Sequence, residues 1–367
     1  METPRSPLIG VYVHIPYCRT ICPYCDFVKR PIKGTVPPAF LNALCSEIDA
    51  FDGASEVDGV FFGGGTPSLI AVDDFARVMD ALRARFSLTP DAEVTLEANP
   101  DDVTPELMNA WTASGVNRIS MGVQSFNDEA LRYLGRRHDA DGARRACGLV
   151  AERLPNWNMD LIFGVPPLEE WRATLETCRS FQPAHVSAYG LTYEAGTPFG
   201  KRANEAIDDE TYLNQFHEVD AVLDEYERYE VSNLARPGFQ CALNLRYWHN
   251  EEYAGFGPAA YSYLSGVRSR NCVKTDEYIA APGSKQESIR LSEREVRVET
   301  LIQHFRLKRG LEKAYYEARF GASLDSDFGP VLQGLVARGL LLEAEGFIRP
   351  TPKGFELNNE IGLALVG

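Results

Sequence analysis

Three cysteines lie close together near the start of the chain, in the segment YCRTICPYC. Cys18, Cys22 and Cys25 have the spacing CxxxCxxC, and the other five cysteines are scattered along the chain. Thiolates bind zinc and iron–sulfur clusters. A structural zinc site takes four ligands, usually as two spaced pairs, and here the fourth would have to be Asp26 or His14. A [4Fe–4S] cluster on three cysteines instead leaves one iron free to bind a small molecule.

Composition limits the classes of function. The chain has 367 residues, of which 44% are hydrophobic, and a net charge of −15. That charge argues against general nucleic-acid binding, because attraction to phosphates needs a basic surface. No apolar run is long enough to span a membrane, and METPRSPLIGVYVHIP lacks the apolar core of a signal peptide. Scattered cysteines favour a reducing compartment, so we expect a cytoplasmic protein.

Six short apolar segments rich in β-branched residues alternate with helical patterns. The segments are 8–15, 58–63, 93–98, 117–123, 157–163 and 185–191. Between them, Asp73 is predicted to cap a helix that ends at Phe86, and Thr104 precedes a second helix with Pro105 in its first turn. Alternating strands and helices predict a parallel sheet. Six units favour an α/β fold of the partial (β/α)6 barrel type, with a doubly wound open sheet as the alternative.

A glycine-rich segment, FFGGGTPS, follows the second predicted strand. Glycines allow a backbone to approach a ligand closely, and their exposed amide groups can bind a polar amino-acid moiety. The segment also fits a tight turn with no ligand. Gly64, Gly65 and Thr66 are the candidate binding residues.

Polar side chains occur at the ends of the next three predicted strands. Glu97 lies in LEANP, Gln124 in SMGVQSF and Asp160 in NMDLIFGVP. Each alone fits a structural polar residue, and a buried carboxylate needs a partner. Carboxyl ends of parallel strands share one edge, so together the three predict a ligand site.

The cysteine spacing after a first strand resembles the radical S-adenosylmethionine (SAM) superfamily. The resemblance implies a [4Fe–4S] cluster on Cys18, Cys22 and Cys25, with SAM bound at the open iron and cleaved by one electron. It implies that Gly64, Gly65, Thr66, Glu97, Gln124 and Asp160 contact SAM. It also places Arg136 at the SAM carboxylate and Tyr12 at the adenosine, and Tyr24 matches an aromatic residue common before the third cysteine. From composition alone, Arg136 fits a surface helix and Tyr12 the core.

The order of motifs resembles the oxygen-independent coproporphyrinogen oxidase group and, within it, the HemW-type haem chaperones. The resemblance includes YEVSNLARPGFQC, GFGPAAYS and RPTPKGFELNN. Oxidases of this group carry a further cysteine two positions after the third, where this chain has Phe27, and a longer N-terminal arm. The resemblance therefore implies a haem chaperone that passes haem to an unknown acceptor protein and needs an electron donor. The alternatives are a porphyrin-acting enzyme (oxidase or related methyltransferase) and an interaction protein with a structural cluster.

HemW-type chains typically show HNxxYW, whose histidine is linked to haem. This chain reads LNLRYW, with Leu243 in place of the histidine. Asn244, Tyr247 and Trp248 remain, and His249 is the substitute candidate for the iron ligand. Leucine cannot coordinate iron, so a Leu243→His change is expected to strengthen haem binding.

The chain divides into three predicted regions. Residues 1–200 form the partial barrel, 201–289 an irregular extension that closes over it, and 290–367 a small helical module with a β-wing. The last region has 11 Lys and Arg against 11 Asp and Glu. A winged helix without net positive charge is a poor candidate for DNA binding.

Overall fold

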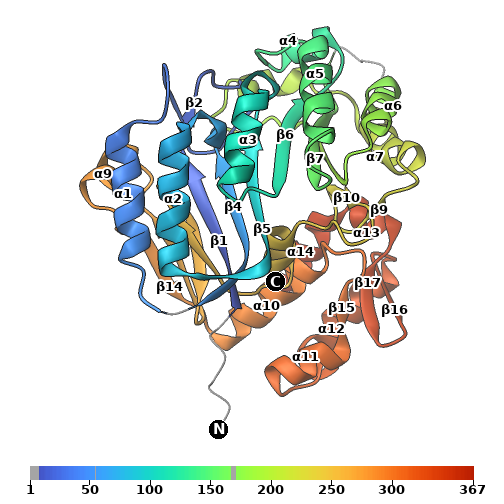
Figure 1. Cartoon of the computed structure of the whole chain (residues 1–367). Coiled ribbons are helices and arrows are strands. Elements are labelled where there is room, and N and C mark those ends of the chain that lie inside the picture. The colour runs from blue at the N-terminus through green and yellow to red at the C-terminus, as the bar shows by residue number, and fades with distance from the viewer. Residues whose placement is uncertain (1–7, 54, 167–170) are drawn as a thin grey trace.

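The computed structural model describes residues 8–53, 55–166 and 171–367. Its central feature is a large sheet in which six strands run parallel and side by side in chain order (Figure 1). They are β1 (Leu8–Ile15), β4 (Glu56–Gly64), β5 (Ser87–Ala98), β6 (Arg118–Gln124), β7 (Trp157–Phe163) and β8 (His185–Gly190). All six were predicted from the sequence, and the α/β partial-barrel fold is confirmed.

Helices cover the outer face of these strands (Figure 1). They are α1 (Pro38–Asp49), α2 (Val72–Arg85), α3 (Pro105–Ala113), α4 (Asp128–Tyr133), α5 (Ala140–Ala151) and α6 (Trp171–Phe181). On β1, Val11, Val13 and Ile15 are fully buried in the main apolar core. Tyr12 and His14 alternate with them and face the inside of the partial barrel, because successive side chains on a strand point to opposite faces.

The two predicted helix starts differ in outcome. At α3 the Thr104 side chain accepts a hydrogen bond from the Leu107 amide, as expected for a cap residue. At α2 the predicted Asp73 cap is wrong: the capping position is Ala71, whose side chain has no acceptor, and Asp73 lies in the first turn. An acidic residue there still favours the helix through its dipole.

Residues 201–289 are more regular than predicted. They contain α7 (Asp209–Val222), α8 (Ala242–Trp248), α9 (Thr275–Ala280), β9 (Glu227–Arg228), β10 (Asn233–Ala235), β11 (Tyr253–Phe256), β12 (Tyr261–Leu264), β13 (Val267–Asn271) and β14 (Lys285–Arg290). β10 and β9 extend the sheet beyond β8, and β11 to β14 extend it beyond β1. The segment is rich in Tyr, Asn and Gly and its strands are short, which is why the sequence predicted an irregular region.

The C-terminal region has an apolar core of its own, which includes Leu301, Phe305, Tyr316 and Leu332. Its elements are α10 (Glu293–His304), β15 (Leu311–Glu312), α11 (Lys313–Phe320), α12 (Leu324–Ala337), β16 (Leu341–Ala344), β17 (Phe347–Pro350), α13 (Pro352–Glu356) and α14 (Asn358–Val366). The predicted hairpin is the β16–β17 pair. The boundary near residue 290 stays a prediction.

Among the described residues, no helix is long and apolar enough to cross a membrane. The first seven residues, part of the segment in which we expected no signal peptide, lie outside the described ranges. All eight cysteines are free thiols. Four of the five outside the cluster motif are buried, whereas Cys45 is only half-buried.

Candidate functional site

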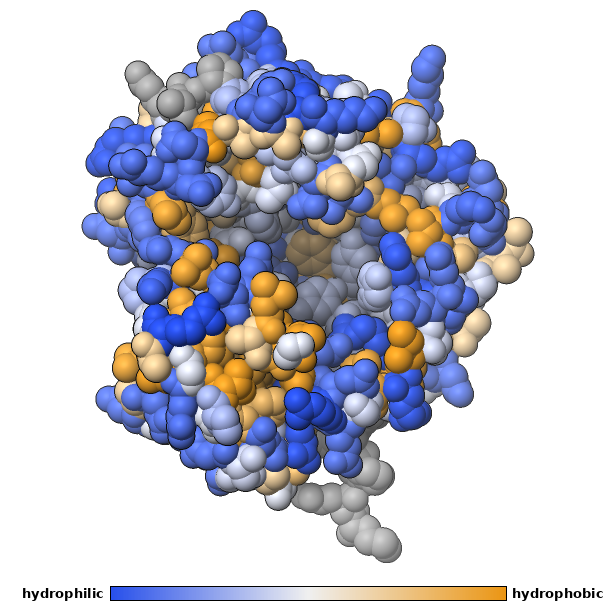
Figure 2. All heavy atoms as spheres, turned by 180° about the vertical axis from the view of Figure 1, so that it is seen from behind, coloured by the Kyte–Doolittle hydropathy of each residue, from blue (hydrophilic) through white to orange (hydrophobic). Residues whose placement is uncertain are grey.

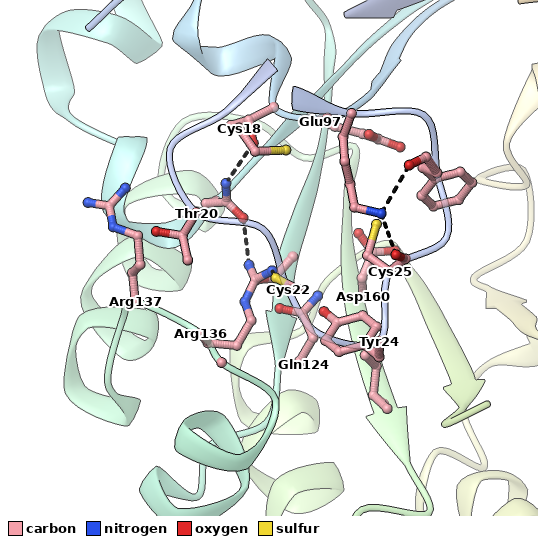
Figure 3. A pocket seen from close by; sticks show the side chains of 18 of the residues that line it. Cys18, Thr20, Cys22, Tyr24, Cys25, Glu97, Gln124, Arg136, Arg137 and Asp160 are labelled. Carbon is pink, nitrogen blue, oxygen red and sulfur yellow. Dashed lines mark hydrogen bonds between the residues drawn. The ribbon is translucent and has the colours of Figure 1, made fainter. Parts of the chain in front are cut away.

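A cavity of about 390 Å³ lies at the carboxyl ends of the parallel strands. Viewed from the side opposite the helices, the molecule is hollowed near its centre (Figure 2). The cavity is lined by Cys18, Cys22, Cys25, Gly64, Gly65, Thr66, Glu97, Gln124, Arg136 and Asp160. Ten of the eleven predicted cluster and SAM residues therefore meet in one place (Figure 3). Its volume is within the usual range of ligand pockets, about 300 to 1,000 Å³.

Tyr12 is the exception, since it does not line the cavity. It stacks on Phe61 with a ring-centroid separation of 6.4 Å, and its hydroxyl lies 3.0 Å from His14 Nδ1. The residue belongs to the apolar layer beneath the site. Contact between Tyr12 and an adenosine stays a prediction.

The cysteines lie on a loop that is closed at its base by two short strands, β2 (Tyr17–Cys18) and β3 (Arg30–Pro31). Within the loop, the Cys25 amide donates to the Cys22 carbonyl at 3.2 Å and forms a tight turn. Cys18 is buried, and Cys22 and Cys25 are half-buried at the cavity wall. A short loop pinned at both ends holds three thiols against one space.

The alternative of a zinc site fits less well. Both ring nitrogens of His14 are occupied: Nδ1 by the Tyr12 hydroxyl and Nε2 by the Val28 carbonyl at 2.9 Å. No three metal-binding side chains converge on one point in the described residues, as a mononuclear zinc ion would require. A [4Fe–4S] cluster binds each thiolate through a different iron, so ligands spread around a cavity suit it.

Burial raises the pKa of the thiols of Cys18 and Cys25 above their ordinary value, because a thiolate loses hydration there. A hydrogen bond from Thr66 opposes this at Cys18, and the cation of Lys29 opposes it at both cysteines. Iron would replace these protons, since metal ligation requires thiolates.

The glycine-rich loop after β4 is required sterically. Gly64 has φ +108°, and a Cβ there would lie 2.5 Å from the His14 ring. A Cβ on Gly65 would lie 2.7 Å from the Tyr17 carbonyl oxygen. The segment is therefore a tight turn, in which glycine allows close contact with the backbone of Tyr17. It is also part of the candidate ligand site, because the turn places Thr66 in the cavity wall.

Glu97 and Asp160 are the two predicted carboxyl groups among the acidic residues that line the cavity. Glu97 accepts a hydrogen bond from the Gly64 amide at 3.0 Å, and burial together with the nearby Asp160 raises the pKa of Glu97 to about 8. Asp160 accepts from Asn158 at 2.8 Å and from Ser120 at 3.1 Å, and burial raises its pKa as well. Desolvated carboxyl groups in a cavity are candidates for binding ligand hydroxyl groups.

Gln124 and Arg136 complete the rim. Gln124 is 7% exposed and has the unusual φ of +63°. Its Oε1 has no hydrogen-bond partner among the described atoms, so a ligand donor would satisfy it. Nη2 of Arg136 donates to Asn99 at 2.5 Å and to the Gly122 carbonyl at 2.9 Å, whereas its Nε has no partner in the described part of the chain. The guanidinium is thus held in place, and its Nε–H is available to a ligand.

Asn99 and Tyr189 are among the residues of the cavity wall that sequence reasoning did not single out. Asn99 joins Arg136 to Thr66, and Tyr189 of β8 is 43% exposed beside the strand ends. Asn99 lies in the quoted LEANP motif and follows the end of a strand, a position that could have identified it. Tyr189 lies near the end of the sixth predicted strand, 185–191, where the same rule applies.

The predicted haem segment lies elsewhere. None of Asn244, Tyr247, Trp248 and His249 lines the cavity. They lie on α8 or directly after it, and α8 packs against β1 and β4. Leu243 is 2% exposed. It packs so closely on Gly10 that a Cβ added to Gly10 would lie 2.5 Å from Cδ1 of Leu243. A histidine at position 243 would be buried in an apolar cluster, so the structure does not favour the expectation that it would bind haem.

The four candidate haem residues have separate surroundings. Tyr247 packs edge-on against Tyr253, and Trp248 lies beneath Arg306. Asn244 lies beside Tyr229. His249 lies at the junction with the C-terminal region, its ring 5.4 Å from that of His304. Burial lowers the pKa of His249, so its imidazole is held neutral, the form that ligates metals.

Comparison with known proteins agrees with this geometry. The Radical SAM superfamily model matches residues 12–178, and the HemN C-terminal domain model matches residues 291–357. The haem chaperone HemW of Escherichia coli is 35% identical over 364 residues, covering 95% of this chain and 96% of that protein. HemW of Bacillus subtilis is 32% identical, covering 98% and 99%.

Among solved structures, coproporphyrinogen III oxidase (HemN) from Escherichia coli superposes with a TM-score of 0.85 at 24% identity. The match covers 99% of this chain and 91% of that one, and shows that the two share a fold. Sequence identity of 35% over nearly the full length of both chains shows membership of the same family as well as a shared fold. The chain therefore belongs to the radical SAM superfamily and, within it, to the HemW family.

Proposed function

We propose that this protein binds haem and passes it to an acceptor protein, with a [4Fe–4S] cluster and SAM bound in the cavity. The observation that carries the proposal is the full-length match to a protein named as a haem chaperone. The radical SAM family implies the cluster and SAM, and the residues that line the cavity suit both. The acceptor and the electron donor are proteins of the same compartment, which we propose to be the cytoplasm.

Cys18, Cys22 and Cys25 would hold the cluster. When reduced, the cluster supplies the electron that cleaves SAM. The glycine-rich loop offers backbone groups to the amino-acid end of SAM, and the unpartnered Nε of Arg136 offers a donor to its carboxylate. The carboxyl groups of Glu97 and Asp160 can accept hydrogen bonds from hydroxyl groups.

Phe27 favours the chaperone over the porphyrin-oxidising alternative. Oxidases resembling this chain carry a cysteine at that position, whereas here a phenyl ring lies at the cavity wall, 64% exposed. A phenyl ring offers no thiol chemistry. It offers apolar area, and burial of such area contributes about 25 cal/mol per Å².

His249 is our candidate for the axial haem ligand, because it is neutral and lies at the surface junction of α8 with the C-terminal region. Leu243 provides no ligand and is buried in the core.

Haem titration of the anaerobically reconstituted protein tests the proposal. We expect saturable binding with a shifted Soret band, and transfer of the haem to an apo-haem protein such as apomyoglobin. His249→Ala should weaken binding, whereas His217→Ala, at an exposed position of α7, should not. Product analysis with SAM, a reductant and coproporphyrinogen tests the alternative. Porphyrin turnover without haem binding would overturn the chaperone proposal.

A further inference from the structure

A chain of hydrogen bonds runs across the cavity from Cys22 to Thr66, which lies beside Cys18. At one end, Nη1 of Arg136 lies 3.4 Å from Cys22 Sγ. At the other, the Thr66 side chain lies beside Cys18 on the cavity wall. Between them lies Asn99, whose Oδ1 accepts from Arg136 Nη2 at 2.5 Å and whose Nδ2 donates to Thr66 Oγ1 at 3.3 Å. In Figure 3, the dashed lines that run from Arg136 toward Cys18 mark the hydrogen bonds of the Asn99 amide with Arg136 and with Thr66.

The direction of every bond in this chain is determined. Arginine has only donors, so the atom of Asn99 that faces it must be the oxygen. The amide nitrogen therefore faces Thr66, and its N–H occupies a lone pair of the hydroxyl. The hydroxyl proton is thereby left free for an acceptor such as the neighbouring Cys18 sulfur. Asn99 thus orients one donor toward each of two sulfurs without touching either.

Donors directed at cluster sulfurs affect the cluster's electronic state. Reduction adds negative charge to the cluster and its thiolates, and hydrogen bonds to sulfur stabilise that charge and raise the reduction potential. Residues that orient a metal's ligands in this way have effects comparable to those of the ligands themselves. Arg136 adds a positive charge, and a charged donor makes a stronger hydrogen bond than a neutral one.

The position of Asn99 explains why an amide is needed there. It directly follows β5, at the start of the short 3₁₀ turn Pro100–Asp102, and it lines the cavity. Aspartate would accept from both neighbours and take the Thr66 proton away from Cys18. Alanine would remove the partner of Thr66 and leave Nη2 of Arg136 with the Gly122 carbonyl as its one remaining acceptor among the described atoms.

We propose that Asn99 is a positioning residue that sets the reduction potential of the cluster, by aiming Arg136 at Cys22 and Thr66 at Cys18. The inference depends on the family's cluster and not on haem transfer. Its test uses no haem, so the result leaves the haem-chaperone proposal untouched.

The test is a redox titration of the reconstituted full-length protein without SAM, followed by EPR of the reduced cluster. Asn99→Ala should lower the potential so that the reduced-to-oxidised ratio at a given potential falls about tenfold, which is about 59 mV for one electron. Iron content should stay at the parent's level. Asn109→Ala, at an exposed position of α3, is the matched control and should leave the potential unchanged.

A double-mutant cycle separates positioning from general damage. If Asn99 acts through Arg136 and Thr66, then Asn99→Ala should add little to the shift already caused by Arg136→Gln with Thr66→Val. Equal shifts in the parent and in that background would overturn the proposal, as would an unchanged potential in Asn99→Ala. Should Asn99→Ala fail to retain the cluster, Asn99→Ser and Thr66→Val replace it. Both are expected to lower the potential, and a parent-like value in both would overturn the proposal.

Discussion

Glu97 offers the sharpest test of how the cavity is built. Burial and the neighbouring Asp160 raise the pKa of this carboxyl group from 4.5 to about 8. The perturbation is Glu97→Gln, which removes the charge and keeps an oxygen for the Gly64 amide, now 3.0 Å from the carboxylate. We expect the variant to be more stable than the parent in the ligand-free form, increasingly so as the pH rises.

The sign follows from proton linkage. Because the pKa is raised in the folded protein, the folded chain keeps this proton at pH values where the unfolded chain has lost it. The parent therefore loses stability as the pH rises from about 4.5 to about 8, and the loss is constant above that range. Glutamine does not titrate, so the variant lacks this loss.

The magnitude has an upper limit. A rise of the pKa from 4.5 to about 8 corresponds to roughly 5 kcal/mol at pH above 8. Glu97 lines a cavity that water can enter, and water reduces the electrostatic penalty. We therefore expect the advantage of the variant to grow by about 2–3 kcal/mol between pH 5.5 and 8.5.

Urea unfolding of the reduced apo-protein, followed by circular dichroism across this pH range, measures the difference. The contributions of the other titrating groups to the free energy of unfolding cancel in this difference, because those groups are present in both proteins. Glu56→Gln, at an exposed position on β4, is the control and should show no such trend. If the difference between Glu97→Gln and the parent is independent of pH, then Glu97 is ionised at ordinary pH and the reasoning about its burial is refuted.

Three further predictions concern the cluster, SAM and the core. Cys18→Ala, Cys22→Ala and Cys25→Ala should each abolish the binding of about four iron and four sulfide per chain, whereas Cys147→Ala, in the core of α5, should not; iron retained in any of the first three would contradict the ligand set. Asp160→Asn should weaken the SAM-induced change in the EPR signal at unchanged iron content, and a parent-like response would remove Asp160 from the SAM site. Leu243→Ala should cost about 2–5 kcal/mol in urea unfolding, because Leu243 is 2% exposed. Leu243→His should likewise lower stability without tightening haem binding, and a tighter complex would show that α8 opens to the porphyrin.

Much of the fold was predictable from local sequence. The six parallel strands are continuous β-branched and apolar runs between helical patterns, and burial on both faces of a parallel sheet requires such runs. Thr104 marked a helix start because its side chain caps the helix within three residues. The short polar strands of residues 201–289 carry no such pattern, since they form only by pairing with the edges of a sheet that already exists.

Part of the candidate site could likewise be predicted from local sequence. Cysteine spacing and glycine runs are visible in sequence because the ligands lie within a few residues of one another. The positions of Glu97, Gln124 and Asp160 followed from one rule, that the carboxyl ends of parallel strands share an edge.

Contacts between distant segments could not be read from the chain. Tyr12 has a suitable residue type, yet its neighbours Phe61 and His14 place it in the layer beneath the cavity. In the sequence, Leu243 takes the place of the histidine that HemW-type chains carry. Only the packing of α8 against Gly10 shows that the Leu243 side chain is buried.

The sequence by itself determined the cluster motif, the parallel strands and the edge at which they meet, because these depend on neighbouring residues and on strand periodicity. Tertiary structure alone decided which polar atoms pair inside the cavity. Asn99 and Arg136 are 37 residues apart, and a single amide between two loops shows no periodicity. Its role depends on distances and bond directions that arise only when the loops are brought together by the folded sheet.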